Sequence, residues 1–256
     1  MFAPTESRMI KQFSTENGTL VPAVTTEQMI EIDRVAIEKT GPALLQMMEN
    51  AGRNLAEMAI QILGKQWREA VIVVLAGSGG NGGGGICAAR HLANRNVDVR
   101  LCLANPDCMS ESAANQYHIY LSTPGREVSG TELANVYPDL IIDALIGYNL
   151  QNVPNRTFAE LIEWANNSEA PVLSLDVPSG IDATTGEAPG ICILPQWTMT
   201  LALPKTGLHA AQVGDLWLAD IGIPEGAYRQ LAIQYNSPFG KRFRVALSEA
   251  PTDFAR

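Results

Sequence analysis

Residues 70–86 read AVIVVLAGSGGNGGGGI, a β-branched and aliphatic run followed at once by glycines. The first part, Ala70–Leu75, has the length of a strand and is apolar on both faces, which is typical of a parallel strand covered by helices on each side. Seven of the nine residues from Gly77 to Gly85 are glycine, and we expect a helix to start near Ile86. This stretch therefore predicts a strand, a glycine loop and a helix in direct succession.

The same two-sided apolar pattern recurs along the chain, with helical segments between its copies. The expected strands are Val97–Leu103, Leu140–Ala144, Pro171–Leu175 and Thr198–Leu203, with a short edge strand near Trp217–Asp220. The expected helices are two N-terminal ones, starting near Thr25 and Leu44, and three at Ile86–Asn94, Ser110–Leu121 and Thr157–Asn166. This alternation predicts an α/β fold with a mostly parallel, doubly wound sheet. We expect one domain over residues 25–240, a flexible leader over residues 1–24 and a loosely attached tail over residues 241–256.

Composition and charge exclude several functional classes. The chain has 256 residues, of which 46% are hydrophobic and 18% charged, so a wholly disordered protein is excluded. Its net charge of −9 predicts that it binds no nucleic acid, because neutralising phosphates requires an excess of lysine and arginine. We expect no membrane segment, since no apolar stretch approaches the roughly 20 residues of a spanning helix. The four cysteines show no disulfide framework or zinc-knuckle spacing, and without a secretion signal the expected location is cytoplasmic.

The glycine loop predicts contact with a phosphate or diphosphate. Glycine lets backbone N–H groups approach an anion with no Cβ in the way, and the following helix N-terminus adds its dipole; a merely tight turn is the structural alternative. Gly77, Gly79 and Gly82 match the dinucleotide fingerprint. However, the second strand does not end in the acidic residue that would hold a ribose, which disfavours an ordinary dehydrogenase. No Gly-Lys-Ser/Thr follows the loop, which excludes a P-loop.

Polar residues follow two of the predicted strands where each ends. Asp143 lies at the end of one strand, and Asp176 ends the next, just before the turn that contains Ser179. A buried carboxylate is costly unless it is paired, hydrogen-bonded or bound to a cation, and capping of loop amides is the structural alternative. Because the carboxyl ends of parallel strands meet at one edge, Asn81, Asp143 and Ser179 would offer oxygen ligands to a hard cation. Lys205 ends another strand and could bind an anion or move a proton, if it is not a solvated surface lysine.

Six further motifs accompany the glycine loop between about Thr25 and Pro224. They are Met48-Glu-Asn-Ala-Gly52-Arg53, Ala88-Ala-Arg90-His-Leu92, Asp143-Ala-Leu-Ile-Gly147, Leu175-Asp-Val-Pro-Ser-Gly180-Ile-Asp182, Pro204-Lys205-x-Gly207 and Ala219-Asp-Ile-Gly-Ile-Pro224. Each motif is short, but their joint order and spacing are specific. Together they resemble the NAD(P)H-hydrate epimerase family, also called the YjeF N-terminal domain.

The resemblance implies a Rossmann-like three-layer αβα sandwich and a homodimer. Family members interconvert the R and S epimers of hydrated NADH and NADPH, and a separate S-specific dehydratase then restores the cofactor. The substrate-binding residues implied by the resemblance are Gly80, Asn81, Gly82, Gly83, Gly84, Gly147, Tyr148, Asn149, Leu150, Gln151, Asn152, Val153 and Asp176. One potassium ion per subunit is implied on Asn81, Asp143 and Ser179. For proton transfer, Asp176 is the first candidate and Lys205 the second.

The glycine loop is a variant of the family pattern. The family loop usually reads Asn-Asn-Gly-Gly-Asp-Gly, whereas here Gly80 replaces the first asparagine and Gly84 the aspartate. After Asp143, the usual Gly-Thr-Gly is replaced by Gly147-Tyr148-Asn149. The lost aspartate removes an acceptor for substrate hydroxyls. The sequence is therefore consistent with two functions: an epimerase, or a catalytically impaired nucleotide-binding regulatory or scaffold protein of the same fold.

Overall fold

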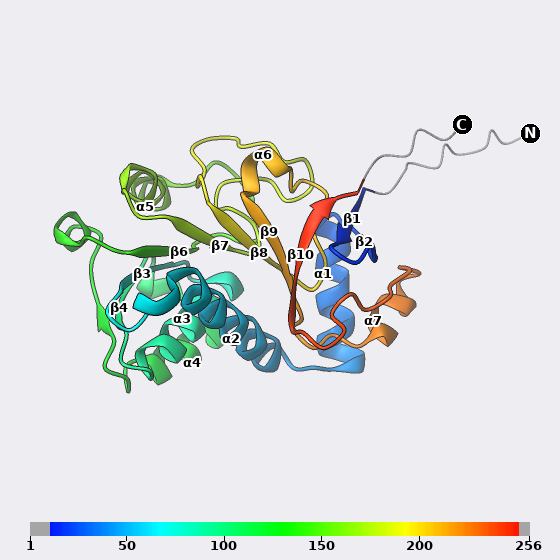
Figure 1. Ribbon diagram of the computed structural model, residues 1–256, viewed down its shortest axis with the longest axis horizontal. Helices are drawn as coiled ribbons and strands as arrows, with labels where there is room; N and C mark the ends of the chain where they lie inside the picture. Colours follow the sequence, from blue (N-terminus) through cyan, green and yellow to red (C-terminus); the bar gives the residue numbers. More distant parts are fainter. Residues whose placement is uncertain (1–10, 251–256) are drawn as a thin grey trace, which may run out of the picture.

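A ten-stranded sheet forms the centre of the structure, a computed structural model that describes residues 11–250 (Figure 1). Its strands are β1 (Gln12–Thr15), β2 (Leu20–Pro22), β3 (Val71–Ala76), β4 (Asp98–Leu103), β5 (Arg126–Glu127), β6 (Leu140–Ala144), β7 (Val172–Leu175), β8 (Trp197–Leu201), β9 (Asp215–Ala219) and β10 (Arg244–Glu249). Their order across the sheet is β2-β1-β10-β9-β8-β7-β6-β3-β4-β5. Neighbours from β5 to β9 pair in parallel, and β10, β1 and β2 add an antiparallel end.

Helices cover both faces of the parallel part of the sheet. The α-helices of the described residues are α1 (Thr26–Val35), α2 (Leu44–Leu63), α3 (Gly80–Ala93), α4 (Glu111–Tyr120), α5 (Arg156–Asn167), α6 (Ala210–Val213) and α7 (Glu225–Gln230). Figure 1 shows α2, α3 and α4 on one face and α5 on the other. Successive residues of β3 point to opposite faces, so Val74 packs in the core that includes α3, and Val73 packs in the core that includes α5. The expected three-layer αβα sandwich is confirmed.

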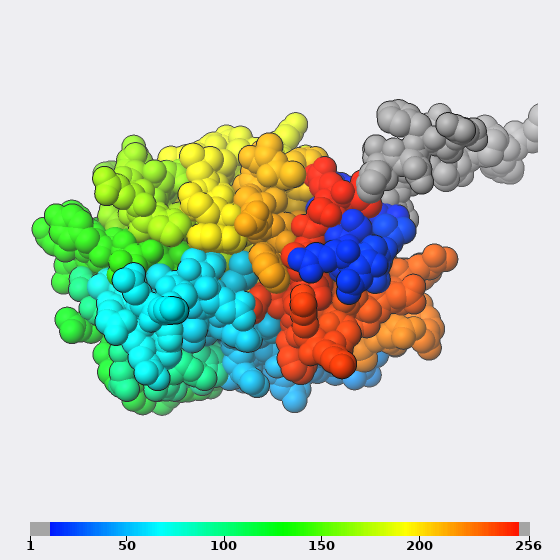
Figure 2. Space-filling view, viewed as in Figure 1, coloured from blue at the N-terminus to red at the C-terminus, as the bar shows by residue number. Residues whose placement is uncertain are grey.

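Both ends of the described chain belong to the sheet. The predictions of a flexible leader over residues 1–24 and a loosely attached tail over residues 241–256 are therefore wrong for the described residues, because β1 and β2 lie in the first segment and β10 lies in the second. β1 pairs with β10 in antiparallel fashion, with Phe13 opposite Glu249, and Figure 2 shows these N- and C-terminal segments side by side in blue and red. Phe13 and Val245 are buried in one core, which gives the two strands their stability. The strand expected near Trp217–Asp220 is β9, but it lies between β8 and β10 instead of at an edge. The outermost parts of the leader and tail lie outside the described residues.

Helix α3 begins six residues earlier than the sequence predicts. It starts at Gly80, with Gly79 as N-cap, so six of the nine residues of the predicted loop Gly77–Gly85 are helical. Glycine lowers helix propensity by about 1 kcal/mol per residue relative to alanine, which is why the pattern favours a loop. Tertiary packing outweighs this penalty. α3 lies so close to its neighbours that only glycine fits, since a Cβ on Gly82 would be 1.8 Å from the carbonyl oxygen of Gly77. A Cβ on Gly85 would be 2.4 Å from the Cβ of Ala144.

The chain reverses its direction of winding between β3 and β6. It runs outward from β3 through β4 to β5, then returns to place β6 on the other side of β3. The connections that leave β3 and β6 therefore diverge to opposite faces of the sheet and leave a crevice at its carboxyl edge, where open α/β sheets bind their ligands.

Candidate active site

A cavity of about 470 Å³ opens at the carboxyl ends of β3, β6 and β7. Seven of the substrate-binding residues predicted from the sequence line it: Gly80, Asn81, Gly84, Gly147, Tyr148, Asn149 and Asp176. The structure does not bring the other six to the cavity wall: Gly82, Gly83, Leu150, Gln151, Asn152 and Val153. Gly82 and Gly83 are buried within α3, and residues 151–153 are exposed beyond the cavity. The opposite wall includes residues of α1 and α2 that the sequence did not predict, among them Asp33 and Met48.

The N-terminus of α3 forms one end of the cavity. Gly79, Gly80 and Asn81 all line it, and the first N–H groups of a helix have no partner within the helix. The positive end of the helix dipole lies in the same place. No atom lies within 4 Å of the position that a Cβ on Gly80 would occupy, so the backbone there is open to an approaching group. This end of the cavity therefore has the chemistry of an anion site.

Asp176 and Lys205 form a buried ion pair at the floor of the cavity. The Lys205 ammonium donates to Asp176 Oδ1, which also accepts from the backbone N–H of Leu201 at 3.2 Å. Asp176 lines the cavity, whereas Lys205 is 1% exposed and lies outside the lining. Lys205 is therefore placed to hold the carboxylate, and its predicted alternative role as a proton carrier would require contact with a ligand that this position does not provide.

Tyr148 connects Asp176 to a second carboxylate. Its backbone N–H donates to Asp176 Oδ2 at 3.2 Å, and its hydroxyl donates to Asp33 Oδ2 at 2.6 Å. Burial raises the pKa of Asp33, an effect that the hydrogen bond from Tyr148 partly offsets. Asp33 escaped the sequence prediction although a pattern pointed to it: it lies four residues after Met29, so an acidic side chain falls on the apolar face of α1.

Asp143 and Ser179 are in direct contact and do not line the cavity. The Ser179 hydroxyl donates to Asp143 Oδ1 at 2.5 Å, and the Ser174 hydroxyl donates to Oδ2 at 2.8 Å. Burial raises the pKa of Asp143, and no charged side chain among residues 11–250 offsets that effect. Asn81 belongs to the same neighbourhood, because Ser179 also bonds to the backbone of Ile146 and a Cβ on Gly147 would be 3.2 Å from Asn81 Oδ1. Of the three residues predicted as cation ligands, Asp143 and Ser179 are thus in contact, and Asn81 lies beside Gly147, the residue that follows Ile146.

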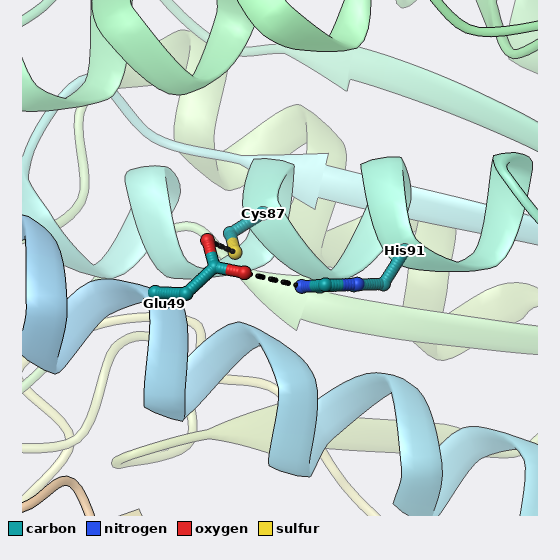
Figure 3. A group of neighbouring side chains, drawn as sticks. All are labelled: Glu49, Cys87 and His91. Atoms are coloured by element: carbon teal, nitrogen blue, oxygen red, sulfur yellow. Dashed lines mark hydrogen bonds and ion pairs between the residues drawn. The ribbon is translucent and has the colours of Figure 1, made fainter.

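A separate polar cluster joins α2 to α3 (Figure 3). Glu49 contacts His91 at 2.8 Å and accepts from the Cys87 thiol at 3.4 Å. A glutamate, a cysteine and a histidine this close together could bind a metal. However, the Arg90 guanidinium pairs with Glu49, and the same nitrogen lies 3.2 Å from Cys87 Sγ and 3.5 Å from His91 Nε2. A cation of the chain itself already occupies the centre of the cluster, which therefore acts as a clamp between the two helices.

Comparison with known proteins shows the family to which this chain belongs. The profile described as "YjeF-related protein N-terminus" matches residues 44–207. The chain belongs to the YjeF_N family. An "NAD(P)H-hydrate epimerase" from Dehalogenimonas lykanthroporepellens is 45% identical over 241 residues, which cover 94% of this chain and 98% of that protein. The resemblance stated from the motifs is thereby confirmed.

Other relatives of this YjeF_N chain have different names. "Enhancer of mRNA-decapping protein 3" from Homo sapiens is 33% identical over 94% of this chain, which spans only 47% of that protein. The "Bifunctional NAD(P)H-hydrate repair enzyme Nnr" of Moorella thermoacetica is 34% identical over 79% of this chain and 41% of its own length. A crystal structure of the yeast protein ynu0 (YNL200c) superposes with a TM-score of 0.75 at 20% identity, covering 89% of this chain and 99% of that one, which supports the fold.

The geometry explains why two of the YjeF_N motifs occur together. Met48-Glu-Asn-Ala-Gly52-Arg53 lies on α2, and Ala88-Ala-Arg90-His-Leu92 lies on α3, where the two helices meet. Glu49 supplies one side of the clamp, and Gly52 leaves room for Cys87, whose Sγ is 2.4 Å from the position of a Cβ there. These motifs therefore join the middle and C-terminal half of α3 to α2.

Proposed function

We propose that the protein interconverts the R and S epimers of hydrated NADH and NADPH. The single observation that carries the proposal is the 45% identity, over 94% of this chain, to a protein named NAD(P)H-hydrate epimerase. The cavity suits such a substrate, since it combines a helix N-terminus at one end with a carboxylate at its floor. We also infer a cytoplasmic homodimer that works beside an S-specific dehydratase, as the family resemblance implies. Within residues 11–250, none of the helices has the length and apolar character that crossing a bilayer requires.

Backbone groups and a helix dipole would bind the negatively charged part of the substrate. The chain has a net charge of −9, so long-range attraction does not favour a dinucleotide anion. The N–H groups around Gly79 and Gly80 act at short range and carry no side chain that would obstruct the diphosphate. Binding there would place the nicotinamide end deeper in the cavity, toward Asp176.

Asp176 would take part in proton transfer at the hydrated ring. In the proposed reaction the ring hydroxyl leaves as water, a planar iminium-like species forms, and water returns to the opposite face. The second step requires a base within hydrogen-bond reach of the entering water. Asp176 lines the cavity, and its carboxylate is fixed in position because Oδ2 accepts from the Tyr148 backbone N–H and Oδ1 accepts from Lys205.

A potassium ion fits the residues around Asp143. The donor set is a carboxylate, a hydroxyl and an amide oxygen, which suits a hard cation. One feature favours such an ion: Asp143 is buried with no charged partner in the described part of the chain. When bound to Asn81, Asp143 and Ser179, the ion would supply the positive charge that the buried carboxylate lacks.

Potassium is expected to stabilise the protein against thermal unfolding. At a tenfold excess over its dissociation constant, a ligand of the native state contributes about 1.4 kcal/mol, which corresponds to a rise in Tm of roughly 3–6 °C for a chain of this size. The measurement compares KCl with choline chloride at equal ionic strength. Ser179→Ala should abolish the difference, whereas Ser174→Ala, which removes another hydroxyl from the same carboxylate, should keep it. Equal Tm values in both salts would contradict the ion site.

The function is tested by supplying the R epimer together with an excess of an S-specific dehydratase. The expected result is complete recovery of reduced-cofactor absorbance, because each R molecule is converted to the S form that the dehydratase consumes. The same mixture without the protein measures spontaneous epimerisation. Recovery no faster than in that control would contradict the proposed activity.

The relatives named as decapping enhancers favour a second candidate, a nucleotide-binding scaffold without turnover. They are 32–34% identical over 93–94% of this chain, and Gly84 replaces an aspartate of the family pattern. This alternative predicts that NADH or NADPH raises the Tm of the protein while the R epimer is not consumed above background. The coupled assay therefore separates the two candidates directly.

A further inference from the structure

Asp33 is a second carboxylate in the cavity, and the proposed reaction above leaves it without a role. It lies on α1 and lines the same cavity as Asp176. Tyr148 reaches both residues, since its hydroxyl donates to Asp33 at 2.6 Å and its backbone N–H donates to Asp176 at 3.2 Å. Two carboxylates are therefore held within the span of one tyrosine, beside the space where a ligand would lie.

We propose that Asp33 is the general acid of the epimerisation, that Tyr148 positions it, and that Asp176 is the complementary base. The assignment rests on the proposed function, because it divides that reaction between two groups. Epimerisation through a planar intermediate needs a proton donor for the leaving hydroxyl and a proton acceptor for the entering water. Two carboxyl groups perform these two tasks only when their surroundings keep one protonated and the other ionised.

The surroundings of the two carboxyl groups differ in this way. Asp176 accepts hydrogen bonds from the Lys205 ammonium and from two backbone N–H groups, which stabilise a negative charge. Asp33 forms no ion pair within residues 11–250, and its hydrogen bond comes from the neutral hydroxyl of Tyr148. Burial raises the pKa of Asp33, with the Asp176 charge adding to the rise and Tyr148 and Lys205 opposing it.

The other side of Asp33 faces α7, and it brings no charge that would reverse this difference. Tyr228 of α7 is the ionisable group there, and it is 2% exposed, with burial raising its pKa well above the ordinary value. It is therefore neutral across the physiological range. The ionisable groups that face Asp33 are thus Tyr148, Asp176, Lys205 and Tyr228.

The bonds and protons balance over one turnover. The Asp33 carboxyl gives its proton to the ring hydroxyl, the carbon–oxygen bond breaks, and water leaves with the planar cation behind it. Water then adds to the opposite face as Asp176 takes its proton, and a new carbon–oxygen bond forms. The proton returns from Asp176 to Asp33 through solvent in the open cavity. Nothing is oxidised or reduced, and no further reactant is needed.

Asp33→Asn is expected to slow epimerisation by about 100-fold or more, the range of a lost general acid. The rate of the wild-type protein should fall at high pH as Asp33 loses its proton, and this limb of the pH profile should be missing in the variant. Tyr148→Phe should retain more activity. It should also move the limb to higher pH, because the hydrogen bond from Tyr148 lowers the pKa of Asp33 and its loss lets that pKa rise. A purely structural role for Tyr148 would not move the limb.

Stability measurements separate catalysis from folding. A carboxyl whose pKa is raised in the folded state destabilises the protein once it ionises, so the penalty is present above the folded pKa and disappears as pH falls. Asp33→Asn should therefore keep or raise the Tm at neutral pH, and the difference should shrink in acid. Glu27→Gln, an exposed carboxylate on the same helix, should change neither rate nor Tm.

The outcomes distinguish this inference from the proposed function. If the wild-type protein epimerises the R hydrate and Asp33→Asn does so at the full rate with an unchanged pH profile, the role of Asp33 is overturned and the function stands. If the wild-type protein shows no activity in the same assay, both are overturned. A folded Asp33→Asn variant with a large rate loss and no high-pH limb supports the assignment.

Discussion

Asp176→Asn is expected to reduce the rate of epimerisation by about 10²–10⁴-fold, the range for a lost acid–base group. Asparagine is the appropriate substitute, because Asp176 has a φ of +69° and asparagine tolerates this left-handed conformation better than most residues. Its amide keeps the size of the side chain but cannot act as a base. The coupled assay with the R epimer measures the loss.

Stability must be controlled in this experiment, because Lys205 is buried against Asp176. Removing one partner of a buried ion pair typically costs about 3–5 kcal/mol, since the other charge is left without compensation. The double variant Asp176→Asn/Lys205→Met removes both charges and should recover part of the lost stability in urea unfolding. It should not recover the rate. Full activity in the single variant would show that Asp176 does not transfer the proton.

Gly82→Ala is expected to destabilise the fold by about 3 kcal/mol or more, at the upper end for overpacking. The new Cβ would be 1.8 Å from the carbonyl oxygen of Gly77 and 2.9 Å from the Gly77 nitrogen. Both are backbone atoms, so no side chain can rotate away, and α3 would have to move from the end of β3. Urea unfolding followed by circular dichroism gives the change in the free energy of unfolding.

Gly80→Ala is the matched control, because it changes the same residue type two positions earlier in the same helix. No atom lies within 4 Å of its new Cβ, and alanine is favoured over glycine in a helix by about 1 kcal/mol. We expect its stability to be unchanged or slightly higher. Equal destabilisation by both substitutions would show that α3 is not packed as closely as described.

Much of the parallel sheet could be predicted because its strands carry a local pattern. Ala70–Leu75 and Leu140–Ala144 are apolar on both faces, and the structure places β3 and β6 there within one residue. β1 and β10 carry no comparable pattern. Phe13 is the only large apolar residue of β1, and this strand depends on pairing with residues more than 230 positions away. A short sequence window contains no information about such a partner.

The residues of the candidate site likewise include some that could be predicted from local sequence and some that could not. Asp143 and Asp176 could be predicted because they lie at the ends of recognisable strands, and Ser179 because it lies in the turn after one of them; parallel strands bring their carboxyl ends to one edge. Asp33 could not be placed there, since the pattern of α1 shows that Asp33 lies on its apolar face but not which part of the protein that face meets. Leu150–Val153 were predicted through resemblance alone, and the chain carries them away from the cavity wall.

Residues 70–86 by themselves determine that a buried strand leads into a backbone suited to an anion. Their β-branched residues favour a strand, and seven glycines leave most of the following backbone without a Cβ. Tertiary structure alone decides that Gly80–Gly85 are helical and that Tyr148 links Asp33 to Asp176. The physical reason is that local preferences are worth about 1 kcal/mol per residue, whereas the close contact of α3 with α2 and the sheet involves many buried groups at once. Such contacts join residues far apart in the chain, and only the folded protein brings them together.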